Sequence, residues 1–343
     1  MTSTLSRAPG AAQQPPGPGR RAGAERAPRE GGMATLLLSP TFIVLALVIA
    51  YPLISALYQS LFAAQSGLDA SGFVVEGENF VGLGNYIDIF TGGDAGRFFN
   101  ALWNTTFFTF VSVGLETIIG VAFAVAMNRA FKGRAFLRAA ILIPWAIPTA
   151  VSGLLWRWIF QSNGIANDLL NQQILWTAEG FASQVAVIIA EVWKTAPFIG
   201  LLVLAGMQLI PEEVYEASKL DGAGAWKQFW QITLPLVRPA LLVAVLFRLL
   251  DALRMFDLPF VMIGPRKSSV ETLSILAWDE SNQLQYGTAS AFAIILLIYV
   301  GLIAYVFIRV LGADVVGDSD ENAAKKATKL AARASRIRKD VAR

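Results

Sequence analysis

The feature that most constrains this chain is an uncharged apolar run from Ala34 to Leu68. About 20 apolar residues are enough to cross the hydrocarbon core of a bilayer, so this run is long enough to span a membrane. Lipid offers the backbone no hydrogen-bond partners, so a spanning segment of this composition is helical. The whole chain is 55% hydrophobic and 15% charged, a composition typical of membrane proteins. We therefore expect an all-α polytopic membrane protein.

Six apolar segments follow one another along the chain, and six spans place both termini on the same side of the membrane. The turn 129–134 after the second segment is basic, whereas the loop 69–97 after the first segment is mostly acidic. Because basic loops stay inside, the turn and both termini are expected in the cytoplasm. The expected spans are about 36–62, 99–128, 135–160, 181–209, 239–260 and 287–308.

The chain divides into a membrane domain and two flanking tails. Residues 1–32 combine several arginines with proline, glycine and alanine, and we expect a disordered basic cytosolic tail there. Residues 33–311 form the expected transmembrane domain of six helices. Residues 312–343 form a second cytosolic tail, whose basic end is expected to lie on anionic membrane lipid or in solvent.

Two residue types are missing from the sequence, and their absence removes several kinds of chemistry. The chain has no cysteine, which excludes disulfides and thiolate metal sites, and no histidine, the commonest general base and metal ligand. It also lacks the G-x-x-x-x-G-K-[ST] pattern of a phosphate-binding loop. We therefore expect no catalytic residue, no metal site and no cofactor bound by this chain.

A polar stretch, residues 211–235, separates the fourth and fifth apolar segments on the cytosolic side. Pro211 suits a first helical position, and Gly222 can adopt the left-handed conformation that ends a helix. The stretch therefore predicts two short helices joined at Gly222, with Pro235 and Pro239 at the entry to the next span. From physical arguments alone, these helices either transmit movement from a separate motor subunit or form an ordinary connecting loop.

The same stretch resembles a known signature. Glu216-Ala217-Ser218, then three residues, Gly222, nine residues and Ile232-x-Leu234-Pro235 are similar to the EAA motif of permease subunits in bacterial ABC importers. Ser218 stands where the family often has a second alanine, a small residue for a small residue. Flanking segments are similar to the carbohydrate, or maltose-permease-like, branch, and most of all to the first permease subunits of actinobacterial trehalose importers. These segments are 80–86, 142–158, 191–198 and 247–257, and the resemblance covers about 33–311.

The resemblance implies a type I ABC importer permease fold with a cytosolic coupling helix seated in an ATPase subunit. It implies a multi-pass protein of the bacterial plasma membrane that works with a second permease, two copies of the ATPase and an extracytoplasmic sugar-binding lipoprotein. ATP and magnesium would be bound by the ATPase, and no nucleic acid is involved. The residues implied in coupling to the ATPase are Glu216, Ala217, Ser218, Asp221 and Gly222.

The fifth span contains a ladder of charges at intervals of three residues. Alternating signs at this spacing would lie on one face of a helix and could neutralise one another. Charges inside a membrane are costly and normally face a bundle interior or a wet cavity. They are expected either to line a sugar pathway or to form a structural ion-pair lock, and the resemblance favours the pathway. The ladder consists of Arg248, Asp251, Arg254 and Asp257.

The fourth span combines polar and aromatic residues in the way that a sugar-binding surface does. Pro197 is expected to break this helix locally and to free carbonyl groups. The alternative is a structural pair between Glu191 and Lys194. Glu116 is a lone carboxylate in the second span and is expected to be a packing partner. The pathway candidates in the fourth span are Glu191, Trp193, Lys194, Thr195 and Phe198.

Together these observations predict a permease subunit of an ATP-driven importer, forming half of the pathway for a di- or oligosaccharide, with trehalose as the best match. Other cargoes on the same scaffold, such as maltodextrin or glycerol phosphate, remain alternatives. Two other classes of protein are also alternatives. The EAA-like stretch argues against the first, an ion-coupled secondary transporter. A membrane-embedded enzyme is opposed by the missing histidine and cysteine.

Overall fold

The computed structural model describes residues 30–68 and 74–311. The predictions for residues 1–29 of the first tail and for the tail 312–343 lie outside the described residues. Helix α1 begins at Glu30, inside the stretch expected to be tail. The chain divides into two units, Met1–Leu53 and Ile54–Arg343, and each is described separately.

The first unit contains most of the first predicted span. Helix α1 (Glu30–Leu45) continues through a π-helical turn η1 (Ala46–Ala50) into α2 (Tyr51–Gln59), which crosses the boundary between the units. The wide turn ends two residues before Pro52, where a regular α-helical turn would bring the proline ring against the preceding carbonyl groups. Together these helices provide an apolar segment, Leu37–Gln59, long enough to cross a membrane.

A β-hairpin follows, which the sequence analysis did not anticipate. Strands β1 (Phe62–Leu68) and β2 (Val74–Phe80) pair antiparallel, with Phe62 opposite Phe80. Asn85, on the short helix α3 (Gly84–Thr91), donates hydrogen bonds to the carbonyls of Ser60 and Phe62. These bonds hold the base of the hairpin against α3.

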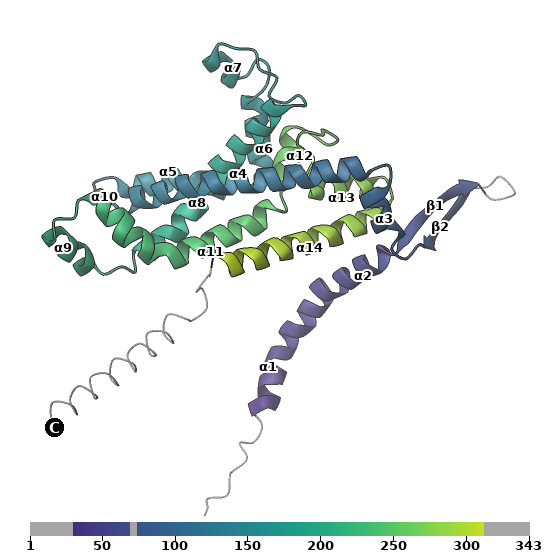
Figure 1. Cartoon of the computed structure of the whole chain (residues 1–343), viewed down its shortest axis with the longest axis horizontal. Helices are drawn as coiled ribbons and strands as arrows, with labels where there is room; N and C mark the ends of the chain where they lie inside the picture. The colour runs from purple at the N-terminus through teal and green to yellow at the C-terminus, as the bar shows by residue number, and fades with distance from the viewer. Residues whose placement is uncertain (1–29, 69–73, 312–343) are drawn as a thin grey trace, which may run out of the picture. The chain divides into compact units, whose positions relative to one another are not determined.

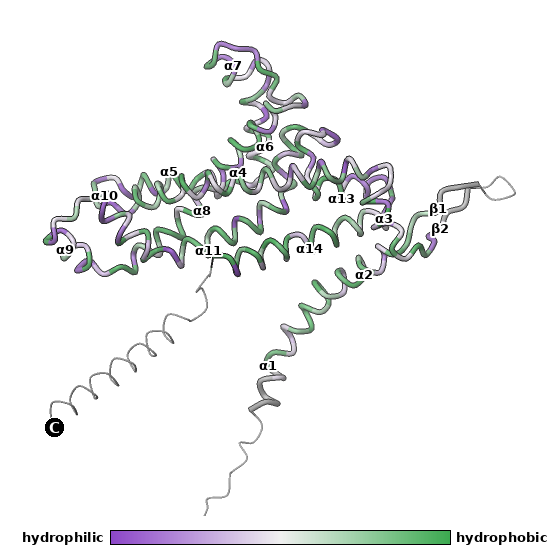
Figure 2. The backbone as a smooth tube through the Cα atoms, in the orientation of Figure 1, coloured by the Kyte–Doolittle hydropathy of each residue, from purple (hydrophilic) through white to green (hydrophobic). Residues whose placement is uncertain are grey.

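Four long helices form the bundle of the second unit: α4 (Ala95–Asn128), α8 (Phe181–Met207), α11 (Leu234–Ala252) and α14 (Tyr286–Val310). They lie side by side in Figure 1, and Figure 2 shows hydrophobic residues along most of their length. Glycine allows α4 and α8 to approach closely, because a Cβ added at Gly120 would lie 2.7 Å from Ile199. The α4–α8 contact forms the centre of the bundle.

The third predicted span is a sharply bent pair of helices. Helices α5 (Arg134–Ala146) and α6 (Thr149–Ile159) meet at an angle of 96°. Ile147 is extended at the break because the residue before a proline, here Pro148, disfavours the helical region. The described residues therefore contain five helices able to cross a membrane, or six if this bent pair is one span.

The fifth span differs from its prediction at both ends. It was expected over Pro239–Phe260, but the helix runs over Ala225–Ala252, through α10 (Ala225–Gln228), the π-helical η2 (Phe229–Thr233) and α11. The second short helix of the polar stretch is therefore the start of this span. Its wide π turn ends two residues before Pro235 and accommodates the proline ring.

The helix ends at Ala252, so the predicted charge ladder does not lie on one helix face. Arg254 falls in the connecting turn, and Asp257 begins the separate helix α12 (Asp257–Met262). The apolar run continues past the end of the helix, which made the span look longer in the sequence. Two short helices complete the unit, α7 (Ile165–Leu170) and α13 (Leu273–Asn282).

Candidate functional site

The polar stretch predicted to couple to a partner forms a short helix, α9 (Glu212–Leu220), at one end of the bundle (Figure 1). Glu212 and Glu213 lie in its first turn, where negative charge complements the helix dipole. Pro211 is extended and precedes the helix as its N-cap residue, one position before the predicted place. Figure 2 shows hydrophilic residues around this helix.

Gly222 ends α9 as the sequence predicted. Its φ angle is +77°, a left-handed conformation that favours glycine. The Gly222 amide donates to the carbonyl of Lys219, and the Ala223 amide donates to the carbonyl of Ser218. This pair of bonds is the Schellman arrangement, which satisfies carbonyl groups at the end of a helix.

The predicted coupling residues divide into four exposed residues and one buried residue. Glu216, Ala217, Asp221 and Gly222 are exposed. Ser218 is buried, and its hydroxyl donates to the carbonyl of Tyr215.

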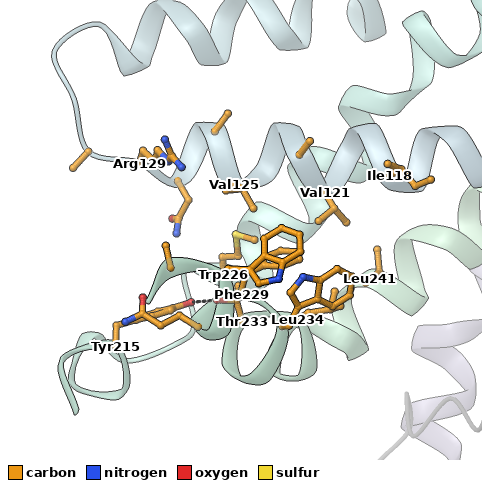
Figure 3. Close-up of a pocket in the computed structure, with 18 of the residues that line it drawn as sticks. Ile118, Val121, Val125, Arg129, Tyr215, Trp226, Phe229, Thr233, Leu234 and Leu241 are labelled. Carbon is orange, nitrogen blue, oxygen red and sulfur yellow. Dashed lines mark hydrogen bonds between the residues drawn. The ribbon is translucent and has the colours of Figure 1, made fainter. Parts of the chain in front are cut away.

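Helix α9 is also connected to the fifth span. The hydroxyl groups of Tyr215 and Thr233 lie 3.2 Å apart and share a hydrogen bond, drawn as a dashed line in Figure 3. Thr233 is the last residue of η2, which continues into α11. A displacement of α9 would therefore reach α11 through this contact as well as through the connecting chain.

The second part of the candidate site is a buried ion network between α4, α8 and α11. Arg248 donates from Nε to Glu116 at 2.7 Å and from Nη2 to Glu191 at 2.9 Å. Its remaining nitrogen, Nη1, pairs with Asp251 one turn further along α11. The side chains of Arg248, Glu116 and Glu191 are 3%, 0% and 8% exposed, whereas that of Asp251 is 65% exposed. One arginine thus holds three carboxylates, and a single one of them reaches the surface.

The other polar candidates of the fourth span take part in different contacts. Lys194 does not form an ion pair with Glu191 in the described structure; its Nζ donates to the carbonyl of Ile147 at 2.7 Å. Ile147 lies at the break between α5 and α6, so this lysine satisfies a carbonyl that the bend leaves free. Thr195 donates to the Glu191 carbonyl within its own helix.

The aromatic candidates of the fourth span pack against the bent pair. Trp193 lies edge-on to Trp156 of α6, and Phe198 lies 5.9 Å from Trp145 of α5. Helix α8 continues through Pro197, so the predicted local break is wrong.

Two members of the ladder lie apart from the network. Arg254 is exposed, and its Nε donates to the carbonyl of Leu250. Asp257 is exposed in the first turn of α12. The predicted neutralisation along the ladder is therefore limited to Arg248 and Asp251.

The pairing of Glu116 with Arg248 across two helices was missed by the sequence analysis. A lone carboxylate in an apolar span requires a partner, and Arg248 is a cation deep in another span. That requirement was the signal in the sequence that could have predicted the pairing of Glu116 with Arg248.

A second ion cluster, also missed, lies at the end of the bundle opposite α9. Arg97 contacts Glu271 and Asp279 at 2.6 Å each and Glu280 at 3.2 Å, and Arg266 also contacts Asp279. Burial alone would raise the pKa of Asp279, but hydrogen bonds from Arg97 and Arg266 outweigh it and lower the pKa. Burial raises the pKa of Glu280.

Comparison with known proteins identifies the family. The family described as "Binding-protein-dependent transport system inner membrane component" matches residues 117–316, which include α9 and the network residues Glu191, Arg248 and Asp251, whereas Glu116 lies one residue before the match. The chain belongs to this family. It is a permease subunit of an ABC importer and is not an enzyme, since the ATPase of such a transporter is a separate subunit.

Two relatives confirm the predicted resemblance to permeases of carbohydrate importers. The chain is 38% identical to the trehalose/maltose transport system permease protein MalF of Thermococcus litoralis, over 82% of this permease and 94% of the relative. It is 36% identical to the trehalose transport system permease protein SugA of Mycobacterium tuberculosis, over 87% and 94%.

A solved structure confirms the fold. A chain from a bacterial ABC transporter that imports the acidic polysaccharide alginate superposes with a TM-score of 0.69. The match covers 82% of this permease and 95% of the solved chain at 20% identity, so it supports the ABC importer permease fold alone.

Proposed function

We propose that this permease forms half of the translocation pathway for a di- or oligosaccharide, with trehalose as the favoured cargo. The observation that carries the proposal is the identity of 36–38% to two permeases whose names include trehalose. The polar network inside the bundle supports it, because a sugar requires hydrogen-bonding groups along an otherwise apolar path.

The proposed complex contains a second permease, two copies of a cytosolic ATPase that bind ATP and magnesium, and an extracytoplasmic sugar-binding lipoprotein. In this arrangement α9 and both termini face the cytoplasm of a bacterial cell. The basic turn at 129–134 supports this orientation, because its first residue, Arg129, lies toward the same end as Tyr215 of α9 in Figure 3. Helices α3 and α13, at the opposite end of the bundle, would then face the binding protein.

Within the pathway, we assign the sugar contact to Asp251 and a positioning role to the residues behind it. The Asp251 side chain is 65% exposed, so its carboxylate can accept hydrogen bonds from sugar hydroxyls. Arg248, Glu116 and Glu191 are buried and bonded to one another, which fixes the place of Asp251 without leaving them free for a ligand.

The remaining predicted pathway residues are assigned by their exposure. Arg254 and Asp257 are exposed beyond the end of α11 and are proposed to meet the sugar near the extracytoplasmic mouth. Lys194 and Thr195 are buried and bonded to carbonyl groups, and Trp193 and Phe198 pack on α5 and α6. These four are proposed to shape the pathway wall.

The charges in the bundle favour a neutral sugar over a phosphate ester. Arg248 is surrounded by three carboxylates, and Lys194 is bonded to a carbonyl group. A phosphate ester would require cations without such partners.

Coupling is proposed to pass from the ATPase to α9 and from there to α11. The ATPase would contact the exposed residues Glu216, Ala217, Asp221 and Gly222, whereas Ser218 is buried and bonded within α9. The contact between Tyr215 and Thr233 supports transmission to the span that carries Asp251. We expect Gly222→Asp or Glu216→Lys to leave the subunit inserted while ATP hydrolysis no longer drives uptake. Normal uptake by both variants would refute this route.

Sugar uptake by the reconstituted complex tests the cargo. The complex and its binding protein are placed in proteoliposomes containing ATP, and uptake of radiolabelled trehalose is measured with a tenfold excess of an unlabelled competitor. A competitor that binds as well as trehalose should lower the labelled uptake by about one order of magnitude. Trehalose itself should compete fully, and glycerol phosphate should not. Uptake of labelled maltose without uptake of labelled trehalose would contradict trehalose as the cargo and favour maltose.

A further inference from the structure

A large cavity lies at the end of the bundle that carries α9. Its volume is about 1540 Å³, and its walls are the last turns of α4, the start of the fifth span, and parts of α5, α8 and α9. In Figure 3, Val121 and Val125 of α4 face Trp226 and Phe229 across it. Most lining side chains are apolar, so the cavity has the character of a site for hydrocarbon.

The charged residues of the cavity are all positive. Arg129 and Lys219 line it, and no carboxylate among the described residues does so. Arg129 follows the last residue of α4, and across residues 30–68 and 74–311 its guanidinium has no hydrogen-bond or ion-pair partner. The cavity thus combines apolar walls with an unpaired cationic rim.

The place of the cavity along the spans is also informative. Both α4 and the Ala225–Ala252 helix have an end here, so the rim lies at the level where the membrane meets water. Trp226 and Trp230 line the cavity and are 76% and 50% exposed. Exposed tryptophans at helix ends are typical of the headgroup region.

From these observations we infer that the cavity binds an anionic phospholipid. Its acyl chains lie between α4 and the Trp226–Trp230 turn, and its phosphate lies at Arg129. Basic pockets between spans on the cytoplasmic side suit anionic headgroups. A soluble anion would gain nothing from the apolar walls, whereas a zwitterionic lipid would gain less from the two cations. The inference does not depend on which sugar is carried.

The main alternative occupant is a protein partner, because a helix of the second permease would also cover the apolar walls of the cavity. A helix would bring no requirement for negative charge, and the unpaired Arg129 and Lys219 would then be left beside it. Charge complementarity therefore favours the anionic lipid.

Lipid retention provides the first test. The full-length chain is purified from nanodiscs with equal amounts of phosphatidylglycerol and phosphatidylcholine, and retained lipid is measured by native mass spectrometry. We expect phosphatidylglycerol to be retained preferentially. Arg129→Gln should reduce that preference about fivefold, equal to the ~1 kcal/mol that one basic residue contributes near an anionic surface. Lys132→Gln, a nearby exposed cation that does not line the cavity, is the matched control and should leave it unchanged.

Fluorescence provides a second test that locates the lipid. Phosphatidylglycerol with brominated acyl chains should quench the wild-type chain more than brominated phosphatidylcholine does, and a Trp226→Phe, Trp230→Phe double variant should lose that difference. Equal retention of the two lipids, or equal effects of Arg129→Gln and Lys132→Gln, would overturn the inference. So would cross-linking of a Val125→Cys variant to the second permease in the assembled complex, since the cavity would then be a subunit interface.

Discussion

Arg248 Nε lies 2.7 Å from a carboxylate oxygen of Glu116, and both side chains are buried inside the bundle. The pair joins α11 to α4, and the same guanidinium reaches Glu191 on α8. Three helices that are distant in the sequence are therefore connected through one arginine. The exposed carboxylate of Asp251 is held at the edge of this connection.

Removing the arginine should harm the fold more than removing one carboxylate. Arg248→Met leaves Glu116 and Glu191 buried without their cation, and breaking a buried pair in this way costs about 3–5 kcal/mol. Glu116→Leu leaves Arg248 two other partners and should cost less. Thermal unfolding of the purified variants in detergent measures which variant loses more stability. The double variant should lose less than the sum of both single losses, and simple additivity would show that the two residues are not coupled.

Asp251 should affect sugar binding more than stability. Asp251→Asn keeps the size of the side chain but removes the charge that strengthens its hydrogen bonds to hydroxyl groups. A hydrogen bond to a charged group contributes about 1.5–3 kcal/mol, so the KM for sugar uptake should rise about tenfold or more. The unfolding temperature should change little because the side chain is mostly exposed.

Arg254→Gln serves as the comparison in the same uptake assay. Arg254 is exposed and its Nε already donates to the Leu250 carbonyl of α11, so its loss should raise the KM less than the loss of Asp251. An unchanged KM for Asp251→Asn, together with a large increase for Arg254→Gln, would move the sugar contact away from the network.

The spans and α9 could be predicted because their signals are local in the sequence. Hydropathy placed the fourth span over about 181–209, and the helix covers Phe181–Met207. Gly222 predicted the end of α9 because few other residues adopt a positive φ angle readily. In both cases the residues that determine the structure lie within the element itself.

The buried network could not be predicted from spacing alone. Spacing in the fifth span indicated a ladder from Arg248 to Asp257, but the helix ends at Ala252, and Arg248 pairs mainly with residues on other helices. Apolar residues continue past Ala252, so hydropathy did not mark the end of the helix. Contacts across such sequence distances depend on how the helices pack, which local patterns do not determine.

Gly222 and Gly224 offer a matched pair of substitutions at the end of α9. An added Cβ would meet nothing within 4 Å at either position, but only Gly222 has a positive φ angle. Gly222→Ala should therefore weaken the helix end by about 1–2 kcal/mol, whereas Gly224→Ala should be nearly neutral. Hydrogen exchange of the α9 amides in the purified permease should show faster exchange for Gly222→Ala alone. Equal exchange in both variants would mean that the left-handed turn does not hold the helix.

The Arg97 cluster should respond to pH in two opposite ways. Asp279 has a lowered pKa in the folded protein, so its stabilising contribution is present above its ordinary value of 3.8 and is lost as the pH falls below it. Glu280 has a raised pKa, so the folded state takes up its proton more readily, and its charged form reduces stability at pH 7.

Two variants separate these contributions. Glu280→Gln should raise the unfolding temperature at pH 7, and the gain should disappear as the pH falls toward the ordinary glutamate value of 4.5. Asp279→Asn should lower the unfolding temperature at pH 7, and this loss should fade as the pH falls below 3.8 and through the lowered pKa that Asp279 has in the folded protein. Unfolding curves across pH measure both. A loss of stability at pH 7 in Glu280→Gln would show that its bond to Arg97 outweighs the cost of burial.

The most direct test of ATP-driven sugar import is ATP hydrolysis by the reconstituted complex of both permeases, the ATPase and the binding protein. Trehalose-loaded binding protein should stimulate hydrolysis well above the level with unloaded binding protein, and labelled trehalose should accumulate only when ATP is present. Accumulation driven by an ion gradient without ATP would contradict the account.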